Sequence, residues 1–398
     1  MMNKNEYVQS DAALAAMADY FQTRKFIALD TEFHREKTYF PQVALLQISD
    51  ADRTYVIDPL ALSDLSPLQR LFTSPDILKV LHSASQDLEV FTQYLQVLPT
   101  PLFDTQIGAA FLGLGEQLSY AALVLHFCER VLDKAHTRSN WLQRPLSTEQ
   151  LTYAADDVLY LANLFPMMCE QLTQLGRFDW VLEECAAKNK MSLYQPKPEE
   201  CWQKVKGKER LHGQSVAALK TLSRWRELAA IAKDRPRRFL LTDELLLELA
   251  QLLPKNAESL AQIIRSDMPW LQSQSASLLE AIAAAEALPP ALWPILKEHK
   301  KRTVEERAQL DAMTKLIQFC AEKNGISQSL LANKSELESL LSGKKELALL
   351  HGWRRQLAGD FLLSFLQGEA GLAILQGVSA ADSVSRYLAN SVTAGEKS

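Results

Sequence analysis

The chain has 398 residues, of which 47% are hydrophobic, 23% charged and 8% aromatic. This length and composition exclude disordered and fibrous classes and provide for two or three globular domains with cores of their own. The five cysteines are widely spaced and form no CxxC pair, which argues against a disulfide framework and a thiolate zinc site. We therefore expect free thiols. We also expect a cytoplasmic protein, because the amino-terminal segment fits neither a secretory signal nor a membrane span.

The net charge of −5 conceals two halves of opposite sign. Residues 1–200 hold 16 Lys and Arg against 26 Asp and Glu, whereas residues 201–398 hold 27 against 22. Within the second half, residues 202–241 hold 11 basic and three acidic side chains. This density favours nucleic acid as a partner, although a solvated helical face has the same composition. The predicted nucleic-acid patch consists of Lys204, Lys206, Lys208, Arg210, Arg224, Arg226, Arg235, Arg237 and Arg238.

The first half of the chain alternates strand-like and helix-like patterns. Short aliphatic runs predict four strands of one sheet, at residues 25–33, 43–50, 54–59 and 77–83. Helices are predicted over residues 83–96, which open on serine caps, 105–113, and 147–176, which open on a capping box of Ser147 and Gln150. Strands that precede the helices in this order predict an α/β domain with a mixed sheet flanked by helices.

The second half has a different character. The stretch "YQPKPEE" (194–200) places two prolines among polar residues and predicts a linker. Beyond it, Leu- and Ala-rich helical patterns indicate an all-α region, and segments 219–254 and 313–343 share one layout, which predicts two copies of a small helical domain. The expected divisions are an α/β domain at 1–193, a linker at 194–208, helical domains at 209–288 and 293–377, and a polar tail at 378–398.

Acidic residues stand at positions where the predicted elements converge. Asp30 and Glu32 in "ALDTEF" are two residues apart in a strand, so their side chains project from the same face at the end of a buried run. Asp87 falls in the first turns of a helix that follows a strand. Taken alone, Asp30 and Glu32 are explained more simply as solvated acids at a strand end, and Asp87 as a helix-capping residue. Adjacent buried carboxylates, however, require a proton or a cation.

The stretch "LTYAADDVLYLANLF" (151–165) adds a further acid on a helix. At 100° per residue, Tyr153 and Asp157 lie along one border of the apolar stripe, whereas Asp156 falls nearer the polar side. Asp157 is therefore better placed to face a site, and Asp156 is expected to be solvated. The i,i+4 spacing places Tyr153 one turn from Asp157.

Carboxylate oxygens without thiolates or a histidine pair favour Mg²⁺ or Mn²⁺ over zinc. Two such ions about 4 Å apart serve phosphodiester hydrolysis. Tyrosine, with a pKa near 10, is a poor general base at neutral pH but can orient a water molecule. We assign that role to Tyr153.

The set Asp30-x-Glu32, Asp87 and Tyr153-x-x-x-Asp157 resembles the DEDDy exonucleases, and "FIALDTEFHREKTYFPQVALLQISD" and "RPLSTEQLTYAADDVLYL" are similar to the ribonuclease D group of that family. The helical half resembles paired HRDC domains, and the second copy departs from the pattern because it lacks the WR dipeptide and the basic run. The resemblance implies a ribonuclease-H-like fold with two divalent ions, Mg²⁺ or Mn²⁺, held by Asp30, Glu32, Asp87 and Asp157, and with Tyr153 positioning water.

The activity that this resemblance implies is 3′→5′ exoribonuclease action that releases 5′-mononucleotides, with tRNA precursors and other structured RNAs with single-stranded 3′ ends as substrates. A monomer without an obligate protein partner or membrane is expected. A DNA exonuclease of the same chemistry is one alternative, because the metal centre reads phosphates and not the 2′-hydroxyl. A non-catalytic RNA-binding protein is the other.

Substrate contacts are expected from residues beside the acids in the chain. Thr31 and Phe33 flank the first acids and are candidates for the terminal nucleotide. The further candidates are His82, Gln86, Arg138 and Trp141. A core role for His82 and a packing role for Trp141 are the alternatives.

Overall fold

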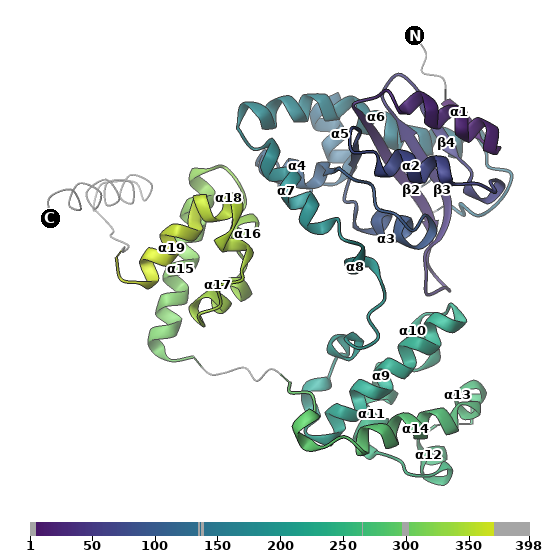
Figure 1. Cartoon of the computed structure of the whole chain (residues 1–398), viewed down its shortest axis with the longest axis vertical. Coiled ribbons are helices and arrows are strands. Elements are labelled where there is room, and N and C mark those ends of the chain that lie inside the picture. The colour runs from purple at the N-terminus through teal and green to yellow at the C-terminus, as the bar shows by residue number, and fades with distance from the viewer. Residues whose placement is uncertain (1–4, 134–135, 137–138, 265, 297–301, 370–398) are drawn as a thin grey trace.

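The computed structural model describes residues 5–133, 136, 139–264, 266–296 and 302–369. An α/β domain is followed by two separate helical units, α9 to α14 and α15 to α19 (Figure 1). The predicted α/β class and all-α second half are therefore confirmed for the described residues.

One mixed sheet of six strands forms the centre of the α/β domain. Its strands are β1 (Asn5–Val8), β2 (Phe26–His34), β3 (Gln42–Ser49), β4 (Thr54–Ile57), β5 (Leu78–Leu81) and β6 (Leu102–Asp104). The spatial order is β1-β4-β3-β2-β5-β6, with β3 antiparallel to both β2 and β4 and the other neighbours parallel. The four predicted strands are β2 to β5. The sequence does not predict β1 or β6: β1 ("NEYV") mixes polar and apolar residues without an aliphatic run, and β6 ("LFD") has three residues, which are too few to establish a pattern.

Strand β2 is central and is covered on both faces. Its residues Ile27, Ala28 and Leu29 are all buried, which explains the continuous apolar run in the sequence. Helix α6 (Thr148–Gln174) packs against β2, β3, β4 and β5. The catalytic candidates Asp30 and Glu32 therefore follow a buried run in a central strand of the sheet.

The other helices of this domain surround the sheet. They are α1 (Asp11–Phe21), α2 (Ser66–Thr73), α3 (Ser85–Tyr94), α4 (Thr105–Phe111), α5 (Tyr120–Cys128), α7 (Phe178–Lys188) and α8 (Met191–Tyr194). The predicted capping box of Ser147 and Gln150 opens α6, as expected. The predicted serine caps of α3 are wrong, because its N-cap is Ala84 and makes no side-chain cap.

The two helical units repeat one order of elements. The first contains α9 (Gln214–Lys233), α10 (Arg237–Leu240), α11 (Asp243–Leu252), α12 (Ala257–Ile263), α13 (Pro269–Ser273) and α14 (Ser275–Glu286). The second contains α15 (Val304–Lys323), α16 (Gln328–Leu331), α17 (Lys334–Leu341), α18 (Gly352–Arg354), a π turn (Arg355–Gly359) and α19 (Asp360–Leu366). A long helix, a one-turn helix and a shorter helix open both units, in agreement with the predicted repeat.

Both helical units contact the α/β domain. The Asp234 carboxylate of the first unit accepts the backbone N–H groups of Tyr39 and Phe40, each at 3.0 Å, in the β2–β3 connection. In the second unit, Arg354 makes two contacts with the Glu184 carboxylate of α7, the longer at 2.8 Å, and the Trp353 indole donates to it at 3.0 Å. Trp353 is 1% exposed, and the second unit shares one continuous core with the α/β domain, whereas the first has a core of its own.

The five cysteines are free thiols, as expected. No helix within the described ranges is long and apolar enough to cross a membrane.

Candidate active site

Four carboxylates from three elements converge at the second half of the central strand β2. Asp30 and Glu32 lie on β2, Asp87 lies in the first turn of α3, and Asp157 lies on α6. Helix α3 follows β5, the parallel neighbour of β2, and α6 packs across β2, so the topology brings the three elements together. Asp87 is 7% exposed, while the other three carboxylates keep partial access to solvent. The site is therefore both desolvated and open to a ligand.

The four carboxylates disfavour one another's charge. Burial, followed by the negative charges of Asp30, Asp157 and Asp87, raises the pKa of Glu32 to about 10. Burial and then the charge of Asp157 raise the pKa of Asp30, and burial and then the charge of Asp30 raise the pKa of Asp87. These mutual effects show that the four groups share one electrostatic environment.

Thr31 links the first two elements of the site. Its hydroxyl donates to Asp87 Oδ1 at 2.5 Å, and the residue is 6% exposed. The register between β2 and β3 shifts between Glu32 and Phe33, and such bulges re-aim side chains beside active sites. The hydroxyl of Thr31, a residue predicted as a candidate for contact with the terminal nucleotide, thus orients a carboxylate of the site.

Asp104 fixes the start of α3. Its carboxylate accepts the backbone N–H groups of Ser83 and Ala84, both at 2.9 Å, and that of Gln106 at 2.8 Å. Ser83 has a φ of 56°, a conformation that needs such support in a residue other than glycine. Asp104 therefore binds the N–H groups that precede α3, where the sequence predicted serine caps, and it positions the turn that carries Asp87. The signal in the sequence was an Asp between a strand and a helix, "FDTQ".

The donor set fits a hard divalent cation. Across the part of the chain that the structure describes, no Lys or Arg forms an ion pair with any of the four carboxylates. Oxygen donors of high negative charge suit Mg²⁺ or Mn²⁺. Among these same described residues, no group of three Asp, Glu, His or Cys side chains is already arranged to hold a metal ion.

Helix α6 presents Tyr153 and Asp157 to a hollow of about 590 Å³. Its wall is formed by Leu132, Asp133, His136, Thr148, Glu149, Thr152, Tyr153, Asp156 and Asp157. Burial and then the charge of Asp156 raise the pKa of Asp157 to about 7. Asp156, which was expected to be solvated, is half-buried beside the same hollow. The negative charge of Asp157, and not that of Asp156, nevertheless contributes to the raised pKa values of Asp30 and Glu32.

Aromatic rings flank the Tyr153 ring. The His136 ring lies edge-on with its centroid 5.9 Å away, and the Trp141 ring lies tilted at 5.9 Å. From α5, the Tyr120 hydroxyl donates to the backbone carbonyl of Asp157 at 2.5 Å. Sequence reasoning missed Tyr120 because nothing local connects the start of α5 with the middle of α6.

The remaining substrate candidates have different surroundings. Trp141 is 2% exposed, so its prediction as a surface for a base is wrong, and the packing alternative holds. His82 is half-buried and shares a hydrogen bond of 3.0 Å with the Thr105 hydroxyl. Gln86 is exposed, and Phe33 is half-buried against the core. Arg138 lies outside the described residues.

The predicted nucleic-acid patch divides in the structure. Arg226 is 5% exposed and pairs with Asp243 at 2.8 Å, so its inclusion is wrong because it holds α9 to α11. Three other arginines form ion pairs: Arg224 with Glu199, Arg237 with Glu227 at 3.3 Å, and Arg238 with Glu244 at 3.9 Å. Two further residues donate to backbone carbonyls: Arg235 to that of Lys37 and Lys208 to that of Val205. Lys204, Lys206 and Arg210 are exposed.

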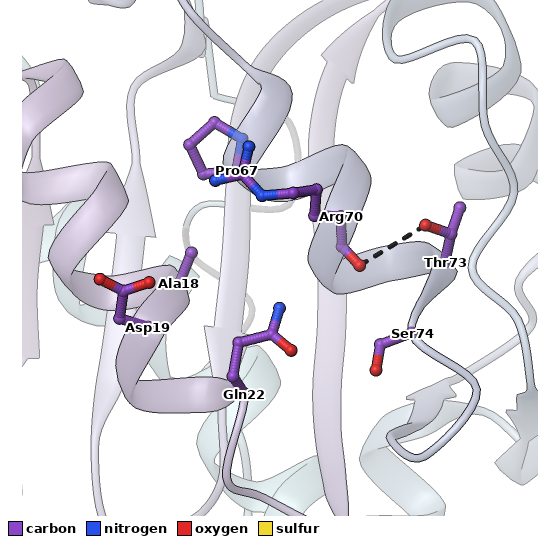
Figure 2. A pocket seen from close by; sticks show the side chains of 7 residues that line it. All are labelled: Ala18, Asp19, Gln22, Pro67, Arg70, Thr73 and Ser74. Atoms are coloured by element: carbon purple, nitrogen blue, oxygen red, sulfur yellow. Dashed lines mark hydrogen bonds between the residues drawn. The ribbon is translucent and has the colours of Figure 1, made fainter.

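A second hollow, of about 440 Å³, lies between α1 and α2 (Figure 2). Asp19 is the one acidic residue among those that line it, and Arg70 stands opposite. It therefore has no carboxylate cluster and is not the site of phosphodiester chemistry.

Family models define the class of this protein. Residues 5–173 match the 3′-5′ exonuclease family, and residues 215–282 match the HRDC domain. The chain is therefore a nuclease, and the exonuclease family is metal-dependent.

The chain belongs to the ribonuclease D family. It is 38% identical to ribonuclease D of Pseudomonas paraeruginosa over 91% of this chain and 97% of the relative, and 35% identical to that of Gluconacetobacter diazotrophicus over 91% and 92%. The crystal structure of Escherichia coli RNase D, described as an exoribonuclease involved in structured RNA processing, superposes with a TM-score of 0.83 at 31% identity, over 92% of this chain and 100% of that one. The catalytic core of RRP6 from Trypanosoma brucei shares the fold, with a TM-score of 0.56 at 22% identity.

Proposed function

We propose that the protein hydrolyses RNA from the 3′ end with two divalent ions, Mg²⁺ or Mn²⁺, and releases 5′-mononucleotides. The observation that carries the proposal is the convergence of Asp30, Glu32, Asp87 and Asp157 from three elements, without a described basic partner. Membership of the ribonuclease D family supports RNA as the substrate.

Each residue has a separate task in this proposal. The four carboxylates would hold the ions, and divalent ions, when bound, supply Lewis acidity to the phosphodiester and lower the pKa of water. The hydroxyl of Thr31 keeps Asp87 oriented, and that of Tyr120 fixes the α6 backbone at Asp157. The phenol of Tyr153, beside the hollow, orients the attacking water.

We further propose single-stranded 3′ ends of structured RNAs, tRNA precursors among them, as substrates, and a monomeric enzyme of the cytoplasm. Both helical units are proposed to be HRDC domains, on the repeated order of their elements. The exposed residues Lys204, Lys206 and Arg210 are proposed to contact RNA phosphates. The proposed domain limits are residues 1–193, 209–288 and 293–377.

The test compares trimming of a tRNA precursor with that of a single-stranded DNA of the same sequence, in Mg²⁺ and in chelator. We expect metal-dependent release of 5′-mononucleotides from the RNA. The matched variants are Asp30→Asn and Asp19→Asn, which remove one carboxylate from the site and one from the second hollow. Asp30→Asn should abolish cleavage while RNA affinity remains, and Asp19→Asn should leave both unchanged. Release from DNA alone, or none from either substrate, would overturn the proposal.

A further inference from the structure

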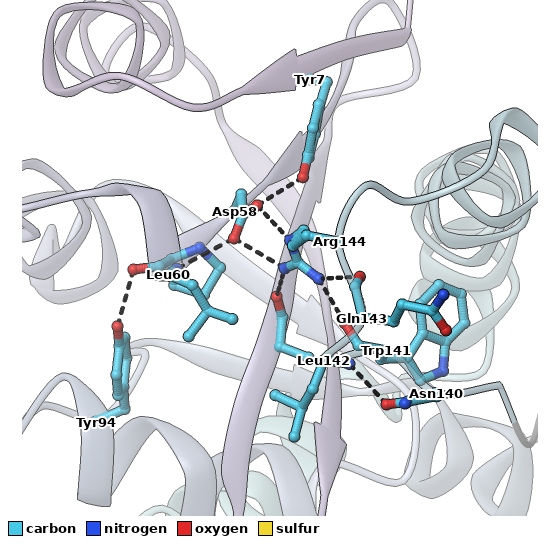
Figure 3. Close-up of polar contacts among 11 residues, drawn as sticks. Tyr7, Asp58, Leu60, Tyr94, Asn140, Trp141, Leu142, Gln143 and Arg144 are labelled. Carbon is cyan, nitrogen blue, oxygen red and sulfur yellow. Dashed lines mark hydrogen bonds and ion pairs between the residues drawn. The ribbon is translucent and has the colours of Figure 1, made fainter.

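Arg144, in the connection between α5 and α6, uses its whole guanidinium group (Figure 3). Its Nε and Nη2 atoms donate to the two oxygens of Asp58 at 2.6 and 2.8 Å. Nη1 donates to the carbonyls of Trp141 and Gln143 at 2.7 and 3.0 Å, and Nη2 also donates to the carbonyl of Ala44 in β3 at 2.9 Å. Arg144 thereby ties the segment 141–144 to two strands of the sheet.

Asp58, at the end of β4, is held from three directions. It is 2% exposed and accepts the Tyr7 hydroxyl at 2.6 Å and the backbone N–H of Leu60 at 3.1 Å, in addition to Arg144. A carboxylate so deeply buried and so fully bonded has one orientation. It is therefore a rigid anchor for the guanidinium group.

Trp141 connects this anchor to the candidate active site. Its carbonyl is bound by Arg144, and its ring, 2% exposed, packs in a small cluster with Ala44, Val56 and Ala154. This cluster is separate from the main core and includes the partly buried Tyr153, whose ring lies 5.9 Å from that of Trp141. A continuous chain of contacts therefore runs from Asp58 through Arg144 and Trp141 to Tyr153.

We infer that Arg144 and Asp58 are positioning residues for the reaction, which act by holding Trp141 against the ring of Tyr153. The inference rests on the role of Tyr153 in the proposed function. Tyr153 places a water molecule and holds no ion, so a loosened ring reduces the rate and leaves metal and RNA binding intact. Displacement of a catalytic group by about 1 Å is enough to cost about 100-fold in rate.

The test is the variant Arg144→Gln, assayed for kcat, for the Mg²⁺ concentration at half-maximal rate, for RNA affinity and for thermal unfolding. We expect kcat to fall about 100-fold, while the Mg²⁺ midpoint and RNA affinity change by less than about twofold. Arg144→Lys keeps the charge and loses the planar fork, so it should show a smaller fall in kcat and supplies the measurement if Arg144→Gln does not fold.

The matched control is Arg24→Gln. Arg24 pairs with the buried Asp50 at 2.9 Å, and Asp50 also accepts a tyrosine hydroxyl, that of Tyr20, at 2.9 Å. This pair likewise joins an arginine to a buried carboxylate side chain that also accepts a tyrosine hydroxyl, and these contacts do not involve segment 141–144. Arg24→Gln should lower the melting temperature and leave kcat within about twofold of the parent.

A double-variant cycle separates positioning from general damage. On a Tyr153→Phe background, Arg144→Gln should reduce kcat by less than about threefold further, because its effect passes through the phenol. A full further loss on that background, or an Arg144→Gln enzyme with the kcat of Arg24→Gln, overturns the inference. If Tyr153→Phe itself keeps the parent rate, the role of Tyr153 in the proposed function fails instead.

Discussion

Replacement of Asp157 by Asn should stabilise the metal-free protein and destroy its activity. Burial and the charge of Asp156 raise the pKa of Asp157 from 3.8 to about 7. Because the folded chain then binds a proton more tightly than the unfolded chain, stability is lost as pH rises from about 4 to about 7, and the cost remains above pH 7. At about 1.36 kcal/mol per pKa unit, this amounts to about 4 kcal/mol at pH 8 as an upper limit.

The assay is thermal and urea unfolding in chelator at pH 5 and pH 8, together with turnover in Mg²⁺. Asp157→Asn should be more stable than the parent at pH 8 by up to about 4 kcal/mol, and the difference should shrink at pH 5. It should also show a smaller stabilisation by Mg²⁺ and no turnover.

Asp156→Asn is the matched control for this prediction. It removes a neighbouring charge from the same turn, and Asp156 does not contribute to the raised pKa of Asp30 or Glu32. It should therefore retain turnover. Equal loss of turnover in both variants, or a less stable Asp157→Asn protein at pH 8, would refute the electrostatic reasoning.

Three further predictions concern metal binding, the core and the second helical unit. Saturating Mg²⁺, at about 100 times its dissociation constant, should add about 2.7 kcal/mol to the unfolding free energy of the parent, and an unchanged melting temperature would contradict the metal site. Lys79→Met should cost about 3 kcal/mol without changing kcat, because the buried Lys79 ammonium donates to three backbone carbonyls and its removal takes a donor from each of them; urea unfolding checks this. Glu184→Gln should increase hydrogen exchange in residues 304–366, because it removes the buried partner of Arg354, whereas Arg355→Gln, at an exposed pair, should not.

Local patterns in the sequence were sufficient for the main elements of the fold. The aliphatic run before Asp30 predicted β2 because that strand is buried on both faces, and the spacing of Ser147 and Gln150 predicted the start of α6. Periodicity also distinguished Asp157 from Asp156, and the charge effects on Asp30 agree with that distinction. The half-buried state of Asp156 was not predicted, because the wall opposite α6 comes from a distant segment.

Contacts between residues far apart in the chain could not be predicted from local sequence patterns. Asp58 and Arg144 are separated by 86 positions, and neither the pairing nor its effect on Trp141 leaves a local signal. The charge of Arg226 suggested a surface patch, yet its guanidinium pairs with Asp243 inside the first helical unit. A basic residue in a helix reads the same in the sequence whether it faces solvent or a buried carboxylate.

The central claim, that Asp30, Glu32, Asp87 and Asp157 together hold the catalytic ions, is tested most directly by anomalous diffraction from crystals of the protein soaked in Mn²⁺. We predict anomalous peaks bounded by these four carboxylates, which weaken in Asp157→Asn crystals and persist in Tyr153→Phe crystals. Peaks elsewhere, or none between these carboxylates in crystals of a protein that cleaves RNA, would contradict it.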